Sequence, residues 1–132
     1  MMNKRHILSA QLYLADADKN IPLFRVPDDH TITVEAAYAV TDTTLAAGTS
    51  NYYTITLLNG GTAGTATTAI SAAAGGTPGW TLSVPKTIAI TDGLGDLTAG
   101  QWLVVKYDET GTLPANTTTV CVEYVEGIGA KA

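Results

Sequence analysis

Hydrophobic and polar residues alternate with a period of two along much of this chain. The clearest example is HTITVEAAYAV, residues 30–40. Such alternation predicts a β-strand that is buried on one face only. One face is predicted to carry Ile32, Val34, Ala36, Tyr38 and Val40, and the other Thr31, Thr33 and Glu35.

Further segments have the composition and spacing of strands. They are NYYTITLL, WTLSV, TIAIT, QWLVVKYDE and TTTVCVEYVE. In QWLVVKYDE, apolar residues occupy both faces from Trp102 to Tyr107, which predicts a central strand that is covered on both sides. ATTAIS is predicted to form a weaker strand, and ILSAQLYL either another strand or one short helical turn.

Turn residues separate these segments. The turn signals are PDD at 27–29, NGG at 59–61, GGTPG at 75–79, DGLGD at 92–96 and ETG at 109–111. Short strands between Gly and Pro turns, without helical periodicity, predict an all-β fold that is an antiparallel β-sandwich or a jelly roll. We expect one such domain over residues 30–132, preceded by residues 1–29 as an extended N-terminal arm or a first strand.

A long segment rich in Gly, Thr and Ala, residues 59–79, follows the strand predicted from Tyr53 onward. The segment carries no charge and has little to bury. Loops of this length in compact domains are usually either functional or disordered. Two alternatives follow: the segment is a disordered loop, or it is an arm that becomes ordered against a neighbouring subunit.

The composition narrows the classes of partner. Charged residues make up 14% of the 132 residues, against about 25% in ordinary globular domains. A surface with few charges suits contact with a protein partner, because few charges must lose their water on binding. The seven Lys and Arg residues are scattered and the formal net charge is −5, so the chain has no basic face for nucleic acid.

The sequence also indicates where the chain is made. No apolar stretch approaches the roughly 18 residues of a membrane helix, so we expect no membrane association. The apolar run after Lys4 and Arg5 is too short for the core of a signal peptide, and we therefore expect synthesis in the cytoplasm. Cys121 is the single cysteine, which excludes an internal disulfide bond.

No motif of a known catalytic or metal site is present. His6 and His30 are far apart in the sequence and neither has the spacing of a metal-ligand pair, so His30 is predicted to cap a turn. Cys121 lies in an alternating strand and is predicted to be a small packed residue. Two aspartate pairs could offer oxygen ligands to calcium, but Asx-turns explain both better. The pairs are Asp16 with Asp18, and Asp92 with Asp96. We expect no enzyme activity, no metal and no cofactor.

The aromatic residues have two possible roles, in the core or at an interface. Trp102 lies within an apolar run and is predicted to be in the core. Trp80 follows a Gly- and Pro-rich break and is predicted to contact another subunit.

Several segments, taken in order, resemble small structural proteins of tailed bacteriophages, namely head decoration (cement) or head-fibre proteins. The segments are FRVPDDHTITVEAAYAV, NYYTITLLNGGTAGT, GGTPGWTLSV, LTAGQWLVVKYDETGT and TTTVCVEYVEG, which span about residues 22–127. The resemblance implies a β-sandwich or jelly-roll subunit without catalysis. It also implies a trimer on the outer surface of the virion, bound to the major capsid protein.

This resemblance leads to a set of candidate interface residues. They are Phe24, Arg25, Tyr52, Trp80, Lys4 and Arg5. Residues 1–29 are expected to form an arm that crosses a neighbouring subunit or the capsid. Deleting residues 1–20 is then expected to abolish capsid binding while the sandwich still folds. The alternative function is a carbohydrate-binding β-sandwich, for example a tail-fibre tip or an adhesin, which would need a row of exposed aromatic residues.

Overall fold

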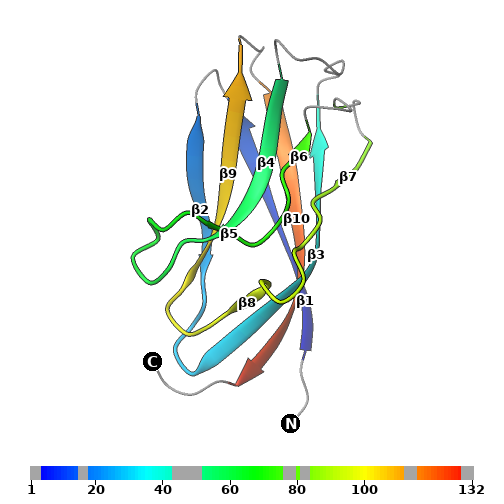
Figure 1. The fold of residues 1–132 in the computed structure, drawn as a ribbon. Coiled ribbons are helices and arrows are strands. Elements are labelled where there is room, and N and C mark those ends of the chain that lie inside the picture. The colour runs from blue at the N-terminus through cyan, green and yellow to red at the C-terminus, as the bar shows by residue number, and fades with distance from the viewer. Residues whose placement is uncertain are drawn as a thin grey trace.

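The computed structural model describes residues 4–14, 18–42, 52–75, 80, 84–111 and 116–128, and of Lys4, Leu14 and Ile128 only the backbone. These residues form two antiparallel β-sheets that face each other, without a helix in the described part (Figure 1). The predicted all-β sandwich is therefore confirmed.

Each sheet has three long strands and one edge that is made of two short ones. Sheet A contains β1 (Lys4–Leu14), β10 (Asn116–Ile128), β3 (His30–Thr41), and the short β7 (Lys86–Thr87) and β8 (Asp96–Leu97). Sheet B contains β2 (Lys19–Arg25), β9 (Trp102–Thr110), β4 (Tyr52–Asn59), and the short β5 (Thr68–Ala69) and β6 (Ala74–Gly75). Both β7 and β8 pair with β3, and both β5 and β6 pair with β4.

The order of strands is that of a jelly roll. Sheet A runs β1-β10-β3 and then β7 or β8, and sheet B runs β2-β9-β4 and then β5 or β6. The chain thus crosses between the sheets after each long strand, and its last two long strands, β9 and β10, insert into the middle of the sheets. Eight strand positions in two sheets with this order define the jelly roll.

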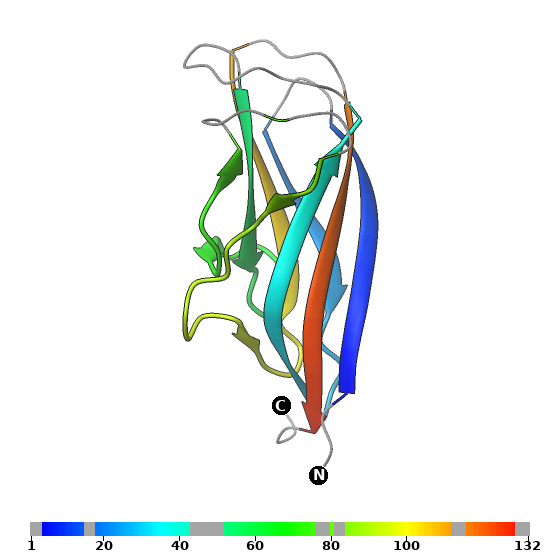
Figure 2. The same ribbon diagram turned by 90° about the vertical axis from the view of Figure 1, so that its right-hand side faces the viewer.

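The first part of the chain belongs to the sandwich. β1 pairs with β10 over its whole length, and β2 pairs with β9 (Figure 2). Of the two alternatives for residues 1–29, an arm or a first strand, the described part contains strands. Deleting residues 1–20 would remove β1 from sheet A, contrary to the expectation that the sandwich folds without this segment.

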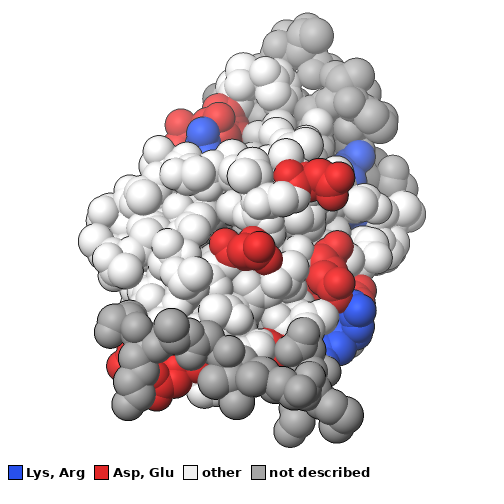
Figure 3. Space-filling model, turned by 60° about the horizontal axis from the view of Figure 1, so that its bottom comes forward, with Lys and Arg blue, Asp and Glu red and all other residues white. Residues whose placement is uncertain are grey.

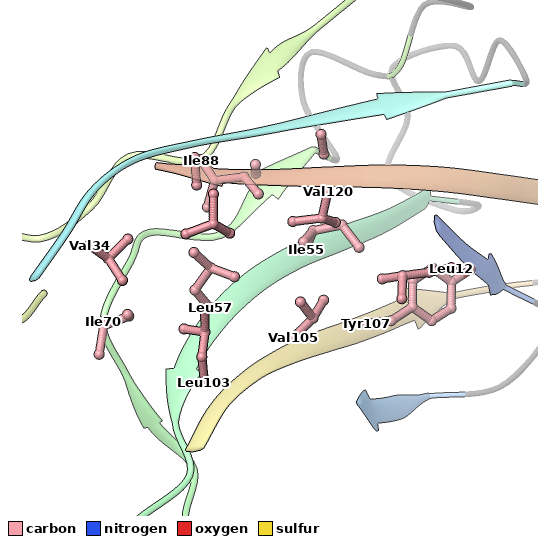
Figure 4. Packing of buried hydrophobic residues seen from close by; sticks show 14 of the residues in the cluster. Leu12, Val34, Ile55, Leu57, Ile70, Ile88, Leu103, Val105, Tyr107 and Val120 are labelled. Carbon is pink, nitrogen blue, oxygen red and sulfur yellow. The ribbon is translucent and has the colours of Figure 1, made fainter. Parts of the chain in front are cut away.

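The core lies between the inner faces of the sheets. Ile55 and Leu57 of β4 face the interior with Leu103 and Val105 of β9, and all four are 0% exposed (Figure 4). From sheet A, Val120 packs against them. Full burial of an aliphatic side chain of this size stabilises the fold by about 1.5–3 kcal/mol.

A β-bulge in β3 reverses the predicted faces of its second half. Ala36 is opposite Glu123 and Val34 is opposite Tyr124, so Glu35 is an extra residue in the ladder. An extra residue shifts the alternation by one position, so that inward and outward residues exchange places. Before the bulge Ile32 and Val34 are buried, as predicted. After it Ala37 and Ala39 are buried, and the prediction that Ala36, Tyr38 and Val40 share the face of Ile32 is wrong.

The two tryptophans have exchanged their predicted roles. Trp80 is 1% exposed, its ring is stacked on that of Tyr53 at 4.6 Å, and its Nε1–H donates to the Tyr53 carbonyl oxygen at 3.1 Å. Trp102 is half-buried at the surface of sheet B, where its ring lies 3.4 Å from the position of a Cβ on Gly64. The predictions of a core Trp102 and an interface Trp80 are therefore both wrong.

The Gly-rich segment covers its own sheet. Leu58 and Val104 are opposite each other on the outer face of sheet B, yet they are only 2% and 1% exposed. Gly60 lies directly over Val104, because a Cβ at Gly60 would be 2.7 Å from Val104 Cγ2. Residues 60–75 are therefore neither a disordered loop nor an arm that needs a neighbouring subunit, because they pack on their own sheet. Residues 76–79 lie outside the described part. β9 is a central strand, between β2 and β4, as predicted; both of its sides are covered at residues 103–105, whereas Trp102 and Lys106 are half-buried.

Trp80→Ala should lower the free energy of unfolding by about 3–5 kcal/mol, because it removes a fully buried aromatic ring. Trp102→Ala should cost only about 1–2 kcal/mol, because part of this ring already contacts water. Urea denaturation of both variants checks the order. Equal losses would contradict the assignment of Trp80 to the core.

Gly75→Ala should be more destabilising than Gly93→Ala by about 1–3 kcal/mol. Both glycines have a positive φ, +107° and +79°, so backbone strain is common to both substitutions. A Cβ at Gly75 would be 2.5 Å from the Tyr53 carbonyl oxygen and 2.6 Å from Trp80 Nε1, whereas a Cβ at Gly93 meets nothing within 4 Å. Thermal unfolding of the two variants measures the difference, and equal melting temperatures would contradict it.

Candidate functional site

The six candidate interface residues do not gather on one surface. Trp80 is in the core. Phe24 is half-buried on β2, with its ring 5.5 Å from that of Tyr124. Arg25 is exposed at the end of β2, where its Nη2 lies 3.2 Å from Asp28 Oδ1. Of the other three residues, Tyr52 is on β4, and Lys4 and Arg5 are on β1.

Tyr52 opens β4 in sheet B and is half-buried. Lys4 opens β1, and its side chain lies outside the described residues. Arg5 is on the outer face of sheet A, where it forms ion pairs with Glu35 at 2.8 Å and Glu123 at 3.7 Å. The bulge presents Glu35 on this face, so the positive charge of Arg5 is balanced by two carboxylates.

Two histidines that are distant in the sequence meet at one carboxylate. His6 Nε2 lies 2.9 Å from Glu126 Oε2, and His30 Nε2 lies 3.1 Å from Glu126 Oε1. The approach of His6 does not have the geometry of a hydrogen bond. His30 Nδ1 is also 2.9 Å from the Asp28 carbonyl oxygen, which agrees with its predicted place at a turn. Glu126 thus connects β1, β3 and β10 at the lower end of sheet A.

Sequence patterns could not predict this cluster, because its members come from three strands that are distant in the chain. Only the pairing of β1 and β3 on either side of β10 brings them together. Among the described residues, no group of three or more His, Cys, Asp or Glu side chains has an arrangement that could hold a metal ion. The cluster brings side chains of β1, β3 and β10 into contact at this end of sheet A.

Burial affects two tyrosines near the ends of the sandwich. Loss of water around Tyr124 raises the pKa of its hydroxyl, and the negative charge of Glu126 raises it further. Burial also raises the pKa of Tyr53, against a smaller opposing effect of the Thr118 hydroxyl, which lies 3.2 Å from the Tyr53 hydroxyl. The neutral form of each tyrosine is therefore favoured in the folded protein.

A hollow of about 280 Å³ lies beside β3 and the turn at residues 91–96. Two of the carboxylates that line it already have partners. Asp96 Oδ1 accepts a hydrogen bond from the Thr33 hydroxyl at 2.7 Å, and Glu35 is paired with Arg5. Asp92 belongs to a turn in which Leu94 N–H donates to the Thr91 carbonyl oxygen. Asp96 thus has a structural partner, and Asp92 lies in a hydrogen-bonded turn. Asp18 accepts a hydrogen bond from Glu109 N–H, and Asp16 lies outside the described residues.

Rows of uncharged side chains lie on the outer side of sheet A, and we call them the uncharged outer face. Aligned residues of three neighbouring strands form it in rows. The rows are Tyr13–Thr117, Gln11–Thr119–Val40 and Ser9–Cys121–Tyr38. These side chains point away from the core, because the alternate residues Leu12, Thr118, Val120 and Ala39 are buried. Charged residues border these rows at both ends: Asp42 follows β3 beside Thr117, whose N–H donates to Asp42 Oδ1 at 3.0 Å, and Glu123 lies in the next row toward the other end.

The side chains of the uncharged outer face are exposed or half-buried. Cys121 is half-buried within it, with Sγ 3.4 Å from Ser9 Oγ. Tyr13 is 68% exposed, and Ile7, which continues the same side of β1, is 71% exposed. At the lower end of the molecule, by contrast, carboxylates stand in separate patches on the surface (Figure 3). A face without charge loses little hydration free energy when a partner covers it.

Comparisons of this chain with known protein families, with curated proteins and with solved structures found no match. No helix of sufficient length and hydrophobicity to cross a membrane occurs among the described residues.

The raised pKa of Tyr53 should make the protein less stable in alkali. The unfolded chain loses this proton near pH 10 and the folded chain only at higher pH. The contribution to stability is therefore complete below about pH 10 and declines as the pH rises toward the folded pKa. The measurement is the urea concentration at the midpoint of unfolding, taken from about pH 9 to about pH 11 and expressed relative to the value at neutral pH. This midpoint should fall less steeply with pH for Tyr53→Phe than for the original protein. Parallel curves would contradict this prediction.

Proposed function

We propose that this chain is a non-catalytic structural subunit of a virion, which binds the outer surface of a tailed-phage capsid and reinforces the shell. The uncharged outer face is the observation that carries the proposal. Three rows of hydroxyl, amide and apolar side chains form a broad surface on one sheet. The low charge of the whole chain, 14%, and the resemblance of its segments to phage decoration proteins support the same function.

The physical basis is a repeated contact of modest strength. Threonine and serine side chains can form hydrogen bonds with a protein partner without the cost of removing water from an ion. Each copy needs to contribute only a few kcal/mol when several copies that are linked to one another bind one lattice, because linked contacts dissociate slowly. The proposed partner is the major capsid protein. The three-fold arrangement implied by the resemblance remains a prediction.

Binding of carbohydrate has less support. Aromatic residues that stack on sugars must be exposed along a groove. Trp80 is buried and Trp102 is partly covered by the segment at Gly64. Tyr13 and Tyr38 on the uncharged outer face belong to different rows.

The location of the protein tests the proposal first. Virus-sized particles from the source culture are separated into heads and tails, and the chain is counted in each fraction by peptide mass spectrometry. Many copies on tail-free heads are expected. Presence in tails alone would instead favour the fibre or adhesin function, and absence from all particles would refute a structural role in the virion.

Binding by matched variants then tests the face. Thr119→Glu places a charge in the middle of the uncharged outer face, and Thr56→Glu places the same charge on the outer side of sheet B. The binding target is phage heads that were prepared without this protein. Thr119→Glu should reduce the number of copies bound per head by at least about tenfold, because the carboxylate must lose its water when the partner covers it. Thr56→Glu should bind as the original does. Circular dichroism confirms that both variants are folded, and equal binding by the two would refute the assignment of this face.

A further inference from the structure

The β1 edge of sheet A has backbone groups that none of the described strands pairs with. β1 pairs with β10 over residues 4–14 without a shift of register. In the described part of the chain, no strand pairs with the other side of β1. Figure 2 shows β1 as the outermost strand of sheet A. An unpaired strand presents a row of N–H and C=O groups to which a further strand can be added.

The other three edges of the sandwich are interrupted. β2 contains Pro22, which lacks an N–H, and has a bulge between Pro22 and Phe24. The free side of β3 is covered by β7 and β8, and that of β4 by β5 and β6. Only β1 combines length with a regular register.

The middle of β1 also lacks the residues that normally prevent the pairing of exposed edges. Soluble proteins protect such edges with charged residues, proline or bulges. The stretch from Ile7 to Tyr13, ILSAQLY, contains no charge, no proline and no glycine. Its two outward-facing large apolar residues, Ile7 and Tyr13, are also the most exposed large hydrophobic side chains among the described residues, at 71% and 68%.

We propose that β1 pairs antiparallel with β1 of a second copy of this chain, so that the two copies of sheet A form one continuous sheet around a two-fold axis. The spacing of the exposed residues sets the register. With Ala10 at the axis, Ile7 of each copy lies opposite Tyr13 of the other, and Ser9 lies opposite Gln11. Each exposed apolar side chain then gains a cross-strand apolar neighbour, and outward-facing residues meet outward-facing residues.

The charge at the start of β1 selects the antiparallel direction. A parallel pair would place Arg5 of one copy beside Arg5 of the other, at about the 4.8 Å spacing of neighbouring strands. In the antiparallel register the two Arg5 residues lie at opposite ends of the seam, about 33 Å apart along the strands. The pairing is a property of the isolated chain and does not depend on capsid binding.

The mass of the full-length chain in solution tests the proposal. Light scattering after gel filtration should give twice 13.7 kDa at high protein concentration. Ile7→Lys with Tyr13→Lys places lysine opposite lysine, and the mass should fall to that of one chain. Val84→Lys with Leu94→Lys is the matched control, because it makes the same change of charge at two exposed apolar residues outside β1, and its mass should stay doubled.

A reversal of one charge tests the register. Ile7→Lys with Tyr13→Glu places lysine opposite glutamate across the seam, and the doubled mass should return. A monomeric original protein, a three-chain mass or an Ile7→Lys, Tyr13→Lys variant that remains double would each overturn the proposal.

Cross-linking provides a measurement that does not depend on charged variants. Residues 7 and 13 of one strand are about 20 Å apart, so a disulfide between them can form only between two copies. In a Cys121→Ser background, Ile7→Cys with Tyr13→Cys should form a covalent dimer on mild oxidation. The absence of that dimer would refute the register even if the lysine variant failed to fold.

Discussion

The stack of Trp80 on Tyr53 is the contact on which the less regular edge of the sandwich depends. The rings lie 4.6 Å apart and nearly parallel, at 8°, and the indole N–H satisfies the Tyr53 carbonyl oxygen. Gly75 of β6 approaches both residues so closely that any side chain there would overlap them. The short strands β5 to β8 contribute few ladder hydrogen bonds. A large buried ring therefore stabilises this edge where regular pairing is absent.

The bulge at Glu35 determines which residues of β3 lie on the surface of sheet A. It turns Tyr38 and Val40 outward and leaves the small residues Ala37 and Ala39 to face the core. It also brings Glu35 to Arg5, so that the charge of the lower rows is balanced within the sheet. The bulge thus decides that Tyr38 and Val40, rather than Ala37 and Ala39, belong to the uncharged outer face. Pairing of two copies through β1 would join two such faces into one larger surface, which is the kind of surface that a lattice partner could cover.

The Gly-rich segment illustrates how a chain with little to bury can still be ordered. Gly60 permits an approach to Val104 that a residue with a Cβ would prevent, and Gly64, with a φ of +77°, lies over the ring of Trp102. Backbone hydrogen bonds anchor it, from Gly60 N–H to Trp102 and from Ala66 N–H to Gly60. The segment is ordered by close backbone contact with its own sheet, and this explains why it needs neither charge nor large side chains.

Period-two alternation and turn residues determined the class of fold and the positions of the long strands, because both are local properties of a strand. The same pattern could not show the bulge at Glu35, since Ala, Tyr and Val are apolar enough to be assigned to either face. It could not distinguish Trp80 from Trp102, because burial depends on which segment covers each ring. His6, His30 and Glu126 meet only through the register of three strands. The sequence alone therefore determined which segments are strands. The tertiary structure decided which side of each strand is buried, because that depends on the pairing register and on the segments that cover each sheet, and both involve residues distant in the chain.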